Sequence, residues 1–191
     1  MEQPDFVKEI LYNKHKVEHW CWYVFHQIKS RYFERNDNPL SPEDIIVLVV
    51  MNGGKYFSDF LFQETSLGKY DMFKIYYITA SSYENNKKLP RDEIKLDFSG
   101  VPDLEKKCVL VVDDIYDSGN TLKAINAELE NRKVKNVENV VLINRIGHHK
   151  HHVPILAYAL QVTTDDYLVG YGLDYNGAYR DLPYVASVKG K

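Results

Sequence analysis

The sequence predicts an α/β protein in which a mainly parallel central sheet is flanked by helices. Apolar, β-branched runs at residues 45–50 and 108–112 are typical of parallel strands that are covered on both faces. Helical patterns alternate with these runs along the chain, which is the order of elements in α/β sheets. Such sheets bind ligands beyond the carboxyl ends of their strands, and polar clusters follow the strands here.

Length and composition exclude several classes of protein. The 191 residues suffice for one domain with a sizeable core. A formal net charge of −3 lacks the basic footprint of nucleic-acid binding, so we expect no nucleic-acid partner. Cys21 and Cys108 are too few for a disulfide framework and indicate a reducing compartment. With no secretion signal and no apolar run near ~18 residues, we expect a cytoplasmic protein without a membrane partner.

Helices are expected before the first strand, at residues 4–12 and 17–33. In the second stretch Trp20, Val24 and Ile28 recur every fourth residue, which is helical periodicity. Neighbouring aromatic residues suit core packing or a subunit interface, and we expect a homo-oligomer, either a dimer or a tetramer. The remaining expected elements are a helix at 56–62, a helix that follows Thr121 and runs to about Glu130, strands at 72–79, 94–98 and 137–143, and an exposed loop at 81–91.

One stretch combines paired acids with a phosphate-type loop. Asp113 and Asp114 follow a buried strand, and such close like charges repel unless a cation or sugar hydroxyls compensate them. The next loop leads into a helix, whose free N–H groups attract phosphate. Taken alone, Asp117 or Ser118 could equally be a helix N-cap.

Residues 109–122, VLVVDDIYDSGNTL, closely resemble the phosphoribosyl diphosphate (PRPP) signature of the type I phosphoribosyltransferases. Residues 50–61 and 166–183 resemble the diphosphate loop and the base-binding segment of the hypoxanthine-guanine branch. This resemblance implies a single phosphoribosyltransferase domain over residues 1–191 with the type I fold. It would comprise N-terminal helices (1–40), a PRPP-binding core (45–145) and a hood segment (160–188), the chain ends forming a small hood over the active site.

The resemblance implies a role for each part of the PRPP site. Asp113 and Asp114 would face the ribose hydroxyls, directly or through Mg²⁺, and Asp174 would be a further metal-binding acid. Asp117 would be the general base near N7 of the purine and part of the PRPP site. The 5′-phosphate would be held by Ser118, Gly119, Asn120 and Thr121, and the diphosphate by Met51, Asn52, Gly53 and Arg180.

The resemblance also implies a mobile loop and a base pocket. Ser82 and Tyr83 match the Ser-Tyr pair of a loop that closes over the reaction. Tyr167 would stack on the purine and the Leu168 backbone would read the ring edge. The lysine that donates to the 6-oxo group in the family falls on Asn144, or on Arg145 after a one-residue shift. Because a carboxamide both donates and accepts hydrogen bonds, this departure admits 6-aminopurines.

We therefore expect an Mg²⁺-dependent enzyme of purine salvage. It would transfer the phosphoribosyl group from PRPP to hypoxanthine or guanine, giving a nucleoside 5′-monophosphate and diphosphate. One alternative is the same reaction on adenine or a modified base. Another is a PRPP-sensing regulator without catalysis, which the acidic net charge disfavours. The histidine-rich run at 148–152 lacks the spacing of a structural zinc site, and we expect it to be a solvated loop.

Overall fold

The computed structural model describes residues 5–34, 45–64, 73–82 and 94–188. Its helices are α1 Lys14–Lys29, α2 Gly53–Asp59 and α3 Asn120–Asn131, and π-helical turns extend α1 and α2 to residues 34 and 64. Its strands are β1 Val7–Tyr12, β2 Ile45–Met51, β3 Lys74–Ser82, β4 Ile94–Asp97, β5 Cys108–Tyr116, β6 Asn136–Arg145, β7 Ala157–Val162, β8 Tyr167–Val169 and β9 Val185–Val188.

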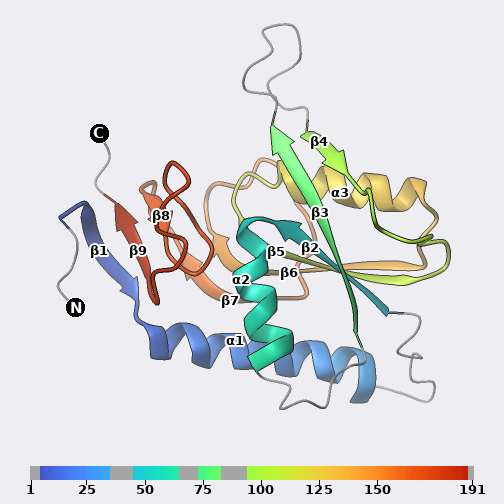
Figure 1. Ribbon diagram of the computed structural model, residues 1–191, viewed down its shortest axis with the longest axis horizontal. Coiled ribbons are helices and arrows are strands. Elements are labelled where there is room, and N and C mark those ends of the chain that lie inside the picture. The colour runs from blue at the N-terminus through green and yellow to red at the C-terminus, as the bar shows by residue number, and fades with distance from the viewer. Residues whose placement is uncertain (1–4, 35–44, 65–72, 83–93, 189–191) are drawn as a thin grey trace, which may run out of the picture.

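The larger sheet has six strands in the order β4-β3-β2-β5-β6-β7 (Figure 1). All neighbouring pairs are parallel except β3 and β4, so the predicted mainly parallel α/β sheet is confirmed. The chain runs from β2 outward through β3 and β4, and then returns to β5 on the opposite side of β2. The order of strands therefore reverses between β2 and β5, and such a reversal leaves a crevice at the carboxyl ends.

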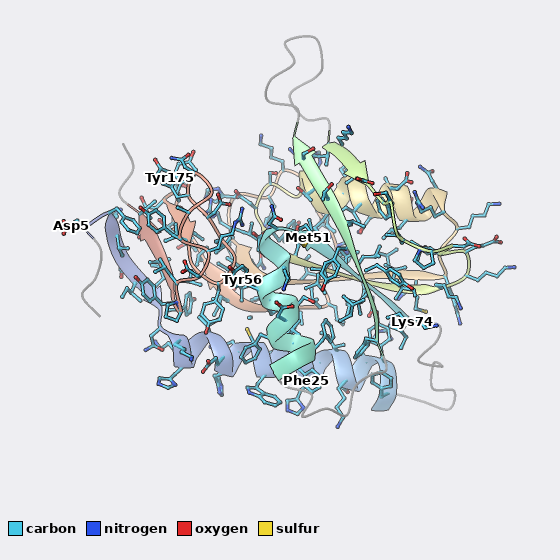
Figure 2. All side chains as sticks on the ribbon, in the orientation of Figure 1. Asp5, Phe25, Met51, Tyr56, Lys74 and Tyr175 are labelled. Carbon is cyan, nitrogen blue, oxygen red and sulfur yellow. The ribbon has the colours of Figure 1, made fainter. Side chains whose placement is uncertain are left out.

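Helices cover both faces of this sheet. On one face α1 and α2 pack on the sheet, with Phe25 and Phe57 buried in the same apolar cluster as Leu110 (Figure 2). On the other face α3 contributes Leu122, Ile125 and Leu129 to a second cluster. Cys21 and Cys108 are both buried and form no disulfide within the described residues.

A second sheet of three strands, β1-β9-β8, joins the two ends of the chain. We call this sheet and the turns at residues 170–184 the hood, and it lies beside the larger sheet (Figure 1). The helix predicted at residues 4–12 is wrong, because Val7–Tyr12 is a strand antiparallel to β9. Val7 pairs with Val188, some 180 residues away, and local periodicity carries no information about such a partner.

Other boundaries differ more modestly from expectation. Helix α1 begins earlier than predicted because the Asn13 side chain accepts a hydrogen bond from the Lys16 backbone N–H at 3.0 Å. Strand β3 reaches Ser82, so residues 81–82 are paired with β4 and not part of the expected loop. Within the described ranges, no helix has both the length and the apolar character that a membrane crossing requires.

Candidate functional site

A cavity of about 240 Å³ opens where β2 and β5 end, at the reversal of the strand order. Figure 2 shows Met51 at this end of β2, beside the start of α2. The hood closes the cavity from the other side. Eight of the predicted site residues line it, namely Met51, Asn52, Gly53, Asp113, Asp114, Thr121, Asp174 and Arg180.

Asp113 is buried at the floor of this cavity, and Asp114 beside it is half-buried. Asp113 is only 5% exposed, and its carboxylate accepts a hydrogen bond from the Asp114 backbone N–H at 2.9 Å. Burial, reinforced by the charge of Asp114, raises the pKa of Asp113 well above its ordinary range. Burial also raises the pKa of Asp114, although a hydrogen bond from Asp113 and the charge of Arg180 oppose that shift. A cation that joined the pair would therefore relieve a real electrostatic cost.

The backbone at the start of α2 lies so close to the end of β5 that a side chain at Gly53 or Gly54 would clash with it. A Cβ atom at Gly53 would lie 1.6 Å from Asp114 Oδ2, and one at Gly54 would lie 2.8 Å from the Val112 carbonyl oxygen. The preceding Met51–Asn52 peptide bond is cis. These close approaches of Gly53 and Gly54 pack the first turn of α2 directly against the carboxyl end of β5.

The predicted phosphate loop connects β5 to α3. Gly119 has φ +86°, a left-handed conformation that favours glycine, and it stands at the N-cap of the twelve-residue helix α3. The Ser118 hydroxyl accepts a long hydrogen bond of 3.4 Å from the Asn120 backbone N–H. Helix α3 therefore starts beside the cavity, which Thr121 lines. The first backbone N–H groups of a helix have no partner within the helix and are available to a phosphate.

The hood contributes an acid and a cation. The Arg180 guanidinium lies 2.5 Å from Asp174 Oδ1 and also donates to the Gly172 carbonyl. Asp174 Oδ2 accepts from the Gly177 backbone N–H at 2.6 Å, which fixes this carboxylate in its turn. Three carboxylates thus line one cavity, although among the described residues no ready-made cage of three metal-ligating side chains exists.

Asp117, at the turn after β5, lies between two side chains. Its Oδ2 is 3.3 Å from Arg145 Nη1, and its Oδ1 is 3.4 Å from His148 Nδ1. Arg145 Nη2 also donates to the Asp166 carbonyl at 3.1 Å, which ties the end of β6 to the start of the hood strand β8. The sequence did not reveal His148, because it belongs to a run expected to be a solvated loop.

The residues predicted for the base are near one another but differ in exposure. Tyr167 is 63% exposed and makes an edge contact with Tyr175 at a centroid distance of 5.4 Å. Leu168 is buried in β8. Asn144 is 8% exposed, and its Oδ1 has no hydrogen-bond partner in the described part of the chain. Of the predicted mobile-loop pair, Ser82 is the last residue of β3 and Tyr83 lies outside the described residues.

Comparison with known proteins identifies the family of this site. The model of the phosphoribosyl transferase domain matches residues 24–176. A hypoxanthine phosphoribosyltransferase of Escherichia coli is 31% identical over 162 residues, which cover 85% of this chain and 84% of that protein. A hypoxanthine-guanine phosphoribosyltransferase of Staphylococcus aureus is 28% identical over 184 residues, or 96% of this chain and 94% of that protein.

Solved structures agree with the sequence matches. A hypoxanthine phosphoribosyltransferase from Staphylococcus aureus superposes with a TM-score of 0.79 at 26% identity, covering 97% of this chain and 93% of that one. The hypoxanthine phosphoribosyl transferase of Trypanosoma cruzi superposes with a TM-score of 0.83 at 20% identity. The superposition covers 99% of this chain and 95% of that one. At that identity the second comparison supports the fold alone.

Proposed function

This chain belongs to the phosphoribosyltransferase family, and we propose that it transfers the 5-phosphoribosyl group of PRPP to a purine, most readily hypoxanthine or guanine. The products are a nucleoside 5′-monophosphate and diphosphate, which is a reaction of purine salvage. The observation that carries the proposal is one cavity that brings together the acid pair Asp113 and Asp114, the start of α3 and the hood residues Asp174 and Arg180.

Each part of the cavity suits one part of PRPP. The N–H groups around Gly119 and the start of α3 provide donors for the 5′-phosphate. Backbone of residues 51–53 and the Arg180 guanidinium suit the diphosphate, since guanidinium groups bind phosphate oxygens strongly. Asp113 and Asp114 would accept hydrogen bonds from the ribose hydroxyls.

Mg²⁺ fits the donor set of this cavity. Asp113, Asp114 and Asp174 offer only carboxylate oxygens, which this ion prefers, and burial disfavours the charged forms of the first two. These three residues would hold the ion, which when bound would neutralise the charge of the leaving diphosphate. The protein itself would orient the ribose.

Asp117 is the proposed general base. The purine nitrogen must lose a proton as the bond to C1 of the ribose forms, and a carboxylate at hydrogen-bonding distance can accept it. Tyr167, exposed at the hood, provides a stacking surface for the ring, and the buried Leu168 leaves its backbone groups to read the ring edge.

The neighbour of Asp117 favours a 6-oxopurine. N7 and the substituent at C6 share one edge of a purine, so a base that presents N7 to Asp117 presents its 6-substituent to Arg145. Arginine only donates hydrogen bonds, which suits an oxo group and opposes an amino group. The second candidate, transfer to adenine or a modified base, draws on Asn144, whose buried and unpartnered Oδ1 is an acceptor.

Initial rates with PRPP, Mg²⁺ and each of hypoxanthine, guanine, xanthine and adenine test the proposal. We expect turnover of hypoxanthine and guanine, while exclusive use of adenine would overturn the base preference.

Asp117→Asn should lower turnover by about 100-fold or more while PRPP affinity changes little. The matched control is Asp103→Asn, because Asp103 is exposed in the loop before β5. Absence of turnover with salt-dependent nucleic-acid binding would favour the regulator instead.

We also propose that the protein self-associates through a second groove, which is apolar. This groove has a volume of about 420 Å³, lies between α1 and the edge strand β7, and is lined partly by Trp20, Tyr23 and Tyr158. Each of these three side chains is more than a third exposed. Light scattering should show a dimer or tetramer, and a monomer at micromolar concentration would contradict this part of the proposal.

A further inference from the structure

The histidine-rich segment between β6 and β7, residues 146–153, is fastened to the phosphate loop. We call this segment the strap. The Ser118 carbonyl accepts hydrogen bonds from the backbone N–H groups of Lys150 at 2.9 Å and His151 at 3.1 Å. The Tyr116 hydroxyl donates to the His151 carbonyl at 2.7 Å and accepts from the Val153 N–H at 3.0 Å. The strap is therefore a fixed neighbour of the site.

The fixed strap places His148 between two carboxylates. His148 Nδ1 faces Asp117 Oδ1 at 3.4 Å, and Nε2 faces Asp165 Oδ1 at 2.9 Å. The His148 side chain is 26% exposed, whereas that of Asp165 is 95% exposed. The Asp117 side chain is itself 43% exposed, so Asp117, His148 and Asp165 form a row of ionisable groups that all reach solvent. The longer contact, to Asp117, is the kind that tightens when substrate is bound.

We propose that His148 acts through Asp117, holding its carboxylate and receiving the proton that Asp117 removes from the purine. This inference rests on the proposed role of Asp117 as general base. Of the two side chains that contact Asp117, only the imidazole is able to accept a proton, because the Arg145 guanidinium remains charged at any working pH. His148 is thus a positioning residue that also restores Asp117 for the next cycle.

The proton balance of the cycle is complete. As the C1–N bond forms and the C1–O bond to diphosphate breaks, the purine N–H proton passes to Asp117. The protonated Asp117 then donates to Nδ1 of neutral His148, whose Nε2–H is held by Asp165. The resulting imidazolium releases one proton to water as the product leaves, and the neutral imidazole forms again.

This cycle requires a neutral imidazole at its start. The charged groups that face His148 are Asp117 from the turn after β5, Asp165 from the turn before β8 and, beyond Asp117, Arg145 at the end of β6. On the strap itself His149 stacks on Tyr116, and Lys150 is exposed. Acid that charges the imidazole should therefore lower steady-state turnover.

The test compares the first turnover with later turnovers in His148→Gln, which keeps a polar side chain but cannot carry the proton. We expect a first turnover within about two-fold of the wild type and later turnovers about ten-fold slower at pH 8, so that a burst of nucleotide appears. The steady-state rate of the variant should lose the pH dependence of the wild type between pH 5.5 and 8. Added imidazole should restore later turnovers in His148→Ala.

His152→Gln is the matched control, since His152 is exposed on the same strap. If His148→Gln slows the first and the later turnovers equally at every pH, His148 has only a structural role and the inference is wrong. Unchanged turnover in His148→Gln, with Asp117→Asn inactive, would overturn it as well while leaving the proposed function intact. A wild-type protein that forms no nucleotide from PRPP would instead refute the proposed function.

Discussion

Replacing Gly53 with alanine should separate activity from stability. The added methyl carbon would lie 1.6 Å from Asp114 Oδ2 and 2.3 Å from its carboxyl carbon. Non-bonded atoms rest at roughly 3.5 Å, so the Asp114 carboxylate must move away by about 2 Å. A displacement of about 1 Å at a reacting group costs on the order of 100-fold. We therefore expect kcat/KM for PRPP to fall about 100-fold.

Stability should respond differently to the same change. Gly53 is the first residue of α2, where alanine is favoured over glycine by up to about 1 kcal/mol. The clash involves a carboxylate that is able to rotate, so the melting temperature in the absence of ligands should stay within a few degrees of the wild type. Differential scanning fluorimetry and PRPP-dependent initial rates measure the two effects on one preparation.

The control is Gly100→Ala, at a glycine with φ +98° and no atom within 4 Å of the added carbon. Left-handed backbone costs a non-glycine residue about 1–2 kcal/mol, so this variant should lose stability and keep its activity. Gly53→Ala should thus lower activity with little change in melting temperature, whereas Gly100→Ala should lower the melting temperature with little change in activity. A Gly53→Ala protein with kcat/KM within three-fold of the wild type would show that Asp114 is not part of the PRPP site.

Two further predictions concern charge and packing. Because burial raises the pKa of Asp113 and Asp114 in the folded protein, the unfolded chain loses these protons first, and the metal-free protein should lose stability as the pH rises above about 4. Mg²⁺ should accordingly raise the melting temperature more at pH 8 than at pH 5, and an equal shift at both would contradict the assignment. Leu110→Ala, at a fully buried residue of β5, should lower the urea-derived free energy of unfolding by about 3 kcal/mol, and a loss below 1 kcal/mol would contradict the packing described.

The central sheet was predictable because its signals are local. The β-branched run of β2 is buried from Ile45 to Val50, which is what an uninterrupted apolar run indicates for a strand inside a parallel sheet. The strand, acidic turn and helix from Cys108 to Asn131 are likewise marked by consecutive residues of the chain. The hood was harder, since β1 forms only by pairing with β9 at the other end of the chain. The contact of His148 with Asp117 is equally non-local, and nothing in the run of histidines indicates which one reaches the site.

Arg180 supplies positive charge to two of the three carboxylates that line the cavity. Its guanidinium contacts Asp174 directly at 2.5 Å, and its charge also opposes the upward shift in the pKa of Asp114. One side chain from the hood therefore supplies positive charge to acids from both the hood and β5. Under the proposed function, Mg²⁺ held by these acids would supply positive charge in its place, and the Arg180 guanidinium would be available to the diphosphate. Charge compensation among the acids and the proposed binding of diphosphate would then be two uses of the same residue.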